Sequence, residues 1–185
     1  MGINRRLMAG PVLIGDDSVV RVLGPDGEVI DTFHSKDLSR GGWGAVYERC
    51  VGLHYEDLGY QVTYRGATLG YLDQGVDLVA SRGQETRFIQ CKFKRSSLGP
   101  TQVEWLLCKA STFVSREAKG RNQFFELVVP SINQAFPQRK AKRERSEIKP
   151  NSALLRLLSY NNTQSQVKIV VTEYPLPVGT PRLER

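Results

Sequence analysis

The chain has 185 residues, of which 40% are hydrophobic and 24% are charged, and this composition is typical of a globular protein with an ordinary core. Its formal net charge of +7 favours a polyanionic partner. The three cysteines (Cys50, Cys91 and Cys108) are an odd number without a C-x-x-C pair, which argues against a disulfide framework or a zinc site. They favour a reducing, cytoplasmic location. No apolar run approaches the roughly 20 residues of a membrane-spanning helix.

Residues 1–42 are predicted to form a β-rich extension. Two β-like runs, 18–23 and 28–33, flank Pro25-Asp26-Gly27, and this arrangement is typical of a hairpin. We expect such a hairpin mainly to stabilise the fold. It could instead form part of a small barrel, a DNA-contacting wing or an extension of the main sheet, and the sequence does not choose among these three.

A helix is predicted over residues 43–58, because apolar side chains recur at three- and four-residue steps. These are Trp43, Val46, Tyr47, Cys50, Val51, His54, Tyr55 and Leu58. Gly59 is a natural stop for this helix. A short strand at 61–64 and a Gly-rich loop at 65–72 follow.

Two further β-like runs, 76–80 and 88–93, carry polar residues that a purely structural strand has little use for. A short polar turn joins them, so they are expected to pair antiparallel. Gln90 and Lys92 are two apart and share one face of their strand, and Asp77 on the partner strand can meet them there. A carboxylate, a carbonyl oxygen and an ammonium would then converge, as Mg²⁺-assisted chemistry on a phosphate requires.

The second half of the chain is predicted to alternate helices and strands. Thr101 and Glu104 form a capping box that starts a helix running to about Ser115. The strand at 124–129 is reached by this crossover helix, so it is expected to lie parallel to its neighbour. A short helix and a last strand follow at 152–160 and 167–173.

Basic residues gather at 138–149 and near the polar strands. They form the natural surface for phosphate contact, although the block at 138–149 could equally be a solvated helix or a loop. The candidates for nucleic-acid binding are Arg65, Lys94, Arg95, Arg139, Lys140, Lys142 and Arg143. Tyr71 and Trp105 could stack on bases, but we expect both in the core.

Four features occur in register along the chain. They are Tyr47-Glu48, Gly59-Tyr60, Gly75-Val76-Asp77-Leu78-Val79 and Ile89-Gln90-Cys91-Lys92. With them, residues 43–131 resemble the PD-(D/E)XK, or restriction-endonuclease-like, nucleases, and most of all the Mrr-like branch, in which Gln replaces the usual Glu. The resemblance implies an α/β fold with a central mixed sheet flanked by helices. It divides the chain into the N-terminal β-rich extension (1–42), a nuclease core (43–131) and a basic C-terminal segment (132–185).

The resemblance also implies roles for individual residues. Asp77 would be the principal metal ligand, Gln90 would lie beside the metal or orient its water, and Glu48 would complete the metal's ligands. Lys92 would position or activate the nucleophile, and Asp73 could support the site or hold a second ion. The implied activity is a Mg²⁺- or Mn²⁺-dependent DNA endonuclease, homodimeric when it cuts both strands, with no nucleotide cofactor and no membrane association.

Other interpretations remain open at this stage. A structure-specific nuclease such as a Holliday-junction resolvase, an RNA-directed nuclease and a non-catalytic DNA-binding module would all fit the same pattern. Asp77 could merely begin a strand, and Glu48 could be an ordinary exposed helix residue. Gln90 and Lys92 could face solvent on an edge strand, where charge blocks aggregation.

Overall fold

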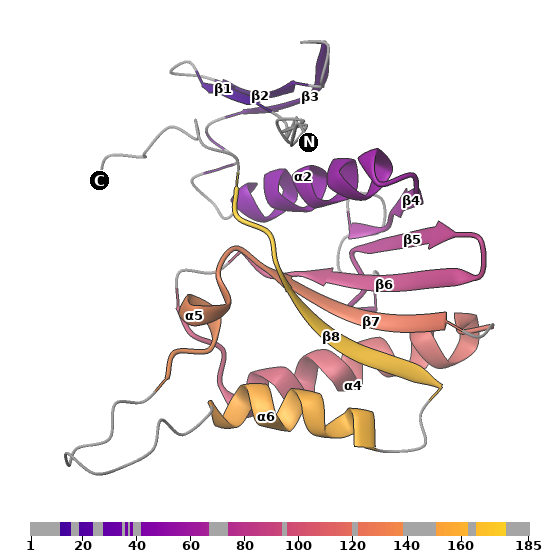
Figure 1. Ribbon diagram of the computed structural model, residues 1–185. Helices are drawn as coiled ribbons and strands as arrows, with labels where there is room; N and C mark the ends of the chain where they lie inside the picture. The colour runs from indigo at the N-terminus through magenta and orange to yellow at the C-terminus, as the bar shows by residue number, and fades with distance from the viewer. Residues whose placement is uncertain are drawn as a thin grey trace, which may run out of the picture.

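The protein combines a five-stranded sheet, covered by helices on both faces, with a separate three-stranded sheet (Figure 1). The computed structural model describes residues 12–15, 19–23, 28–34, 36, 38, 42–66, 74–93, 96–119, 122–138, 151–162 and 166–176. The strands are β1 (Val12–Gly15), β2 (Val19–Leu23), β3 (Val29–His34), β4 (Gln61–Tyr64), β5 (Leu78–Arg82), β6 (Glu85–Cys91), β7 (Asn122–Val129) and β8 (Val167–Glu173). The helices are α2 (Trp43–Asp57), α4 (Pro100–Glu117), α5 (Ile132–Ala135), α6 (Ser152–Ser159) and the 3₁₀ turn η3 (Tyr160–Asn162).

The large sheet is mixed, with strand order β4-β5-β6-β7-β8. The strands β4, β5 and β6 pair antiparallel, and Gly83 with φ of 60° makes the tight turn between β5 and β6. β7 and β8 join parallel, because α4 carries the chain back across the sheet before β7 and α6 does so before β8. The predicted pairing of the two polar strands and the predicted parallel strand are both confirmed.

Helices cover the two faces of the large sheet in different ways (Figure 1). α2 lies on one face and buries Val46, Tyr47, Cys50, Val51 and Tyr55, which confirms the predicted helix with an end one residue earlier. Leu58 caps it, and Gly59 follows with φ of 81°. α4 and α6 cover the opposite face and enclose a second apolar cluster.

The start of α4 differs from the predicted capping box. Pro100 begins the helix, Gly99 is the N-cap, and the backbone N–H of Gly99 donates to Gln102 Oε1 at 3.1 Å. Proline favours the first helical position because its φ is already helical and it has no N–H to satisfy, so the helix begins one residue before Thr101. Glu104 instead forms an ion pair with Arg156 of α6.

The N-terminal extension contains the predicted hairpin, formed by β2 and β3, and β1 adds a third antiparallel strand. Val20 and Val22 are buried in the same apolar cluster as α2, and Arg49 of α2 lies 3.7 Å from the Asp31 carboxylate. The small sheet therefore packs on the outer side of α2 (Figure 1). The domain boundaries drawn from sequence stay a prediction.

Across the described parts of the chain, no helix has the length and apolar character needed to cross a membrane.

Candidate active site

Asp77 lies immediately before β5 and is held by its backbone and its side chain. Its N–H donates to the carbonyl of Ile89 at 2.8 Å, and its own carbonyl accepts from the N–H groups of Arg65 at 2.7 Å and Gly66 at 2.9 Å. The carboxylate is only 3% exposed, and its Oδ2 accepts from the backbone N–H of Cys91 at 2.7 Å and from Gln90 Nε2. Directed N–H donors allow a carboxylate to stay ionised when buried, so Asp77 can be a metal ligand as well as a structural group.

Gln90 meets Asp77 as expected. It is 2% exposed and lies in β6, which pairs with β5 on one side and β7 on the other. The alternative of a solvent-facing residue on an edge strand is therefore wrong for Gln90. Because side chains alternate along a strand, Gln90 shares its face with Phe88, which packs in the cluster under α4. The Gln90 side chain thus lies on the α4 side of the sheet.

Glu48 approaches the same place from α2, which covers the other face. A β carbon on Gly66 would lie 2.5 Å from Glu48 Oε2 and 3.5 Å from Asp77 Cβ, so the Glu48 carboxylate and Asp77 face each other across this glycine. Glu48 is half-buried and is not an ordinary exposed helix residue. A side chain at position 66 would occupy the space that the carboxylate fills. Sequence reasoning missed this role of Gly66, because a Gly-rich loop does not say which of its glycines faces a functional group.

Lys92 and the intervening Cys91 complete the local arrangement. Lys92 follows β6, and its N–H donates to the carbonyl of Val128 at 2.9 Å. Cys91 is 5% exposed and lies in the core, as predicted. Burial raises the pKa of its thiol well above the ordinary value, Asp77 and Glu48 raise it further, and Lys92 opposes them. The thiol therefore stays protonated.

The donor set fits a hard divalent cation. Asp77 and Glu48 supply carboxylate oxygens and Gln90 supplies an amide oxygen, and Mg²⁺ and Mn²⁺ prefer such ligands. Within the described residues, no three His, Cys, Asp or Glu side chains come together as a group that could hold a metal ion. Since Gln90 Nε2 faces Asp77 Oδ2, the amide would have to turn over for Oε1 to share a cation with that oxygen.

The other predicted site residues divide into two groups. Arg65 touches Asp77 through its backbone, while its guanidinium lies 3.7 Å from the centre of the Phe113 ring on α4. This places Arg65 beside the site, half-buried against α4. The remaining candidates lie outside the described residues and stay predictions: Asp73, Lys94, Arg95, Arg139, Lys140, Lys142 and Arg143.

Trp105 is not in the core, and that prediction was wrong. Its side chain is 60% exposed, because the buried stripe of α4 runs through Val103, Leu106, Ala110, Phe113 and Val114. Position 105 falls beside this stripe on the helix, so the helical spacing alone could have predicted that Trp105 is exposed. Tyr71, which was also expected in the core, lies outside the described residues.

Replacing Gln90 with glutamate should make the stability of the fold depend on a divalent cation. The variant puts a second buried carboxylate at hydrogen-bonding distance from Asp77, and like charges that close destabilise each other. In EDTA we expect thermal unfolding about 4–8 °C below that of the unmodified protein, the shift that about 2 kcal/mol causes in a chain of this size. Added Mg²⁺ or Mn²⁺ should reverse most of this loss.

The matched control is Gln123→Glu, because Gln123 of β7 is equally buried, at 2% exposure. This variant should lose stability without any response to metal. If both variants respond to metal alike, Asp77 and position 90 do not share a cation.

A comparison with known families agrees with this geometry. Residues 43–119 match the family model of the Mrr catalytic domain, described as a restriction endonuclease. No curated protein and no solved structure is significantly similar to the chain. The matched range runs from α2 to the end of α4 and contains Glu48, Asp77, Gln90 and Lys92. Residues 43–119 are therefore similar to the Mrr-type restriction endonuclease domain, which agrees with the resemblance to the PD-(D/E)XK nucleases seen in the sequence.

Proposed function

We propose that this protein is a DNA endonuclease that hydrolyses phosphodiester bonds with the help of Mg²⁺ or Mn²⁺. The observation that carries the proposal is the buried Asp77 carboxylate, oriented by the Cys91 N–H and by Gln90, with Glu48 facing it across Gly66. A purely structural aspartate needs no second carboxylate brought to it from a helix. Two carboxylates and an amide oxygen suit a divalent ion.

Each side chain has a distinct part in the proposed reaction. The bound ion would lower the pKa of a water molecule and offset charge on the phosphate. Asp77 and Glu48 would hold the ion, and the Gln90 carbonyl would hold it or orient its water. Lys92 would place an ammonium beside the attacked phosphate, where positive charge stabilises the charge that builds up in the transition state.

The rest of the proposal concerns the substrate and the assembly. Arg65 and the basic residues predicted from sequence would contact the DNA backbone, which the net charge of +7 supports. Cutting both strands of a duplex requires two sites, and we propose a homodimer for that step. Sizing of the protein with and without duplex DNA tests this proposal.

Replacing Lys92 with methionine is expected to lower the cleavage rate about 10²- to 10³-fold, because the stem is kept while the charge at the transition state is lost. The affinity of the variant for Mn²⁺, measured by calorimetric titration, should stay within a few-fold of the affinity of the unmodified protein. Cleavage is measured on plasmid, junction, flap and single-stranded substrates, and the preference among them separates restriction-type from structure-specific cutting. Lys168→Met, an exposed lysine of β8, is the matched control and should cut normally.

One specific observation favours a different class of function, a DNA-binding module without catalysis. The Gln90 amide donates to the Asp77 carboxylate, and this pair alone could satisfy a buried aspartate. Such a module would bind DNA but would neither bind Mn²⁺ nor cut any of the four substrates. That result would replace the nuclease proposal.

A further inference from the structure

α4 presents an exposed tryptophan next to Lys92. Trp105 is 60% exposed, whereas large aromatic side chains are usually buried in large part. A hollow of about 390 Å³ opens beside it. The residues that line this hollow are Lys92, Leu98, Thr101, Gln102, Trp105 and Leu106.

The lining of this hollow has three kinds of surface. Leu98 and Leu106 are 5% and 4% exposed and supply an apolar floor, while Trp105 adds an aromatic wall. Thr101 and Gln102 are exposed at the rim, but the surface that lines the hollow is almost entirely apolar. A flat aromatic group fits such a lining, because its face can stack on Trp105 and its body can contact the apolar floor.

Two lysines lie close to the residues of this hollow. Lys92 belongs both to this lining and to the candidate active site. The Lys109 ammonium lies 5.6 Å from the centre of the Trp105 ring. The hollow therefore shares Lys92 with the place where we put the cleaved phosphate, and a nucleic-acid strand could bring a base to the hollow and a neighbouring phosphate to Lys92.

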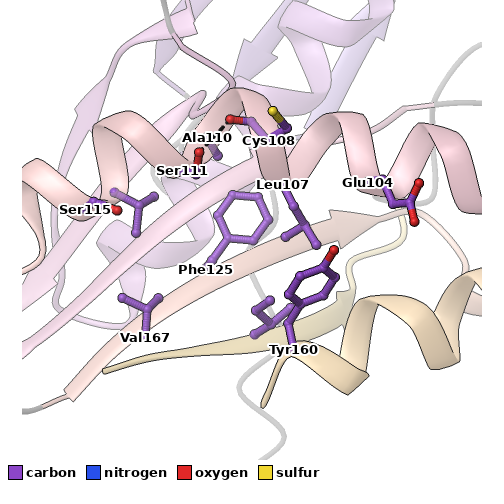
Figure 2. A pocket seen from close by; sticks show the side chains of 11 residues that line it. Glu104, Leu107, Cys108, Ala110, Ser111, Ser115, Phe125, Tyr160 and Val167 are labelled. Carbon is purple, nitrogen blue, oxygen red and sulfur yellow. Dashed lines mark hydrogen bonds between the residues drawn. The ribbon is translucent and has the colours of Figure 1, made fainter. Parts of the chain in front are cut away.

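A second hollow on the same helix lacks this chemistry. It measures about 310 Å³ and lies between α4, η3 and the strands β7 and β8 (Figure 2). Its described lining includes Glu104, Cys108 and Tyr160 but no lysine or arginine, and none of the four candidate catalytic residues. It offers an aromatic ring without positive charge, so it serves as an internal comparison.

We propose that the hollow beside Lys92 binds one unstacked base of the substrate strand, next to the cleaved phosphate, with the base stacked on Trp105. This inference rests on the proposed nuclease function. Unstacking is least costly in single strands and beside mismatches. The protein is therefore expected to prefer strands whose bases are already unstacked at the site of cutting.

The test compares a single-stranded oligonucleotide with an abasic strand of the same length, so that the phosphates are equal and only the bases differ. Binding is measured by fluorescence anisotropy in EDTA, where no metal-dependent cleavage occurs. The unmodified protein is expected to bind the base-bearing strand about tenfold more tightly. Trp105→Ala should remove this preference and leave binding of the abasic strand unchanged.

Two control variants identify stacking as the cause. Trp105→Phe keeps an aromatic face and should retain most of the preference. Tyr160→Ala truncates the aromatic ring of the second hollow and should change nothing (Figure 2). Equal binding of both strands by the unmodified protein, no binding of either, or an equal loss for both strands in Trp105→Ala would overturn the proposal.

The outcome is separate from that of the nuclease proposal, because the binding assay needs no metal. If the protein cuts DNA with Mg²⁺ but shows no Trp105-dependent preference, the base-binding proposal is wrong and the nuclease proposal stands. If the protein shows the preference but cuts no substrate, Trp105 does bind a base and the nuclease proposal is wrong.

Discussion

Asp77→Asn is expected to lower the rate of DNA cleavage about 10³-fold or more, and to leave the protein folded. The loss is expected because the carboxylate that we propose as the principal metal ligand becomes neutral, and a bound metal ion can supply several kcal/mol of transition-state stabilisation. The fold should survive because asparagine keeps an oxygen for the Cys91 N–H, and the Gln90 amide can turn over to accept from the new NH₂ group. Removing a buried charge should even raise the unfolding temperature slightly.

Two measurements make this result specific. Single-turnover cleavage gives the rate, and calorimetric titration with Mn²⁺ should show weaker metal binding in the same variant. Asp57→Asn changes an exposed aspartate at the end of α2 and should affect neither quantity. If Asp77→Asn cuts at the rate of the unmodified protein, the assignment of the metal site is wrong.

The part of the site carried by the β5–β6 hairpin could be predicted from sequence because its geometry is local. A two-residue period puts Gln90 and Lys92 on one face, and a tight turn fixes which residues of the partner strand lie opposite. Asp77 was therefore expected beside Gln90, and the two side chains are hydrogen-bonded. Helix α2 followed from its periodicity and strand β7 from a short apolar run, and both signals are equally local.

The contribution of Glu48 depended on the family resemblance, because its contact with the site is long-range. Nothing in the spacing of α2 shows that the helix passes Gly66, a residue beyond β4 whose missing side chain leaves room for the carboxylate. The hollow beside Trp105 was missed for a similar reason. It forms only where α4 crosses the end of β6, and the distance between those elements is set by the packing of the whole core.

A buried ion pair on the other face of the sheet also escaped sequence reasoning. Arg87 is three residues before Gln90, so its side chain points away from the site, toward the α2 side. Its Nη1 lies 2.8 Å from Oε2 of Glu126, which is 1% exposed, and Thr172 of β8 donates to the other carboxylate oxygen. The Arg87 Nε lies 2.6 Å from Oε1 of Glu85. One arginine thus satisfies carboxylates from two strands.

Arg87→Met is expected to destabilise the protein by about 3–5 kcal/mol, because the variant leaves the Glu126 carboxylate buried without its cation. In a chain of this size that loss lowers the unfolding midpoint by about 6–20 °C. Thermal and urea unfolding measure it. Below the lowered midpoint, cleavage by the variant should stay near normal, because the pair lies on the face opposite Asp77 and Gln90.

Two further variants separate the burial of charge from the loss of an ordinary ion pair. Arg116→Met removes an arginine that is 60% exposed and pairs with Glu117 at 2.8 Å, and it should cost less than about 1 kcal/mol, as surface pairs do. The double variant Arg87→Met with Glu126→Leu removes both charges and should recover most of the stability, since an apolar pair can replace a buried ion pair. If Arg87→Met costs no more than Arg116→Met, Glu126 finds other partners and this ion pair does not determine how β6, β7 and β8 pack.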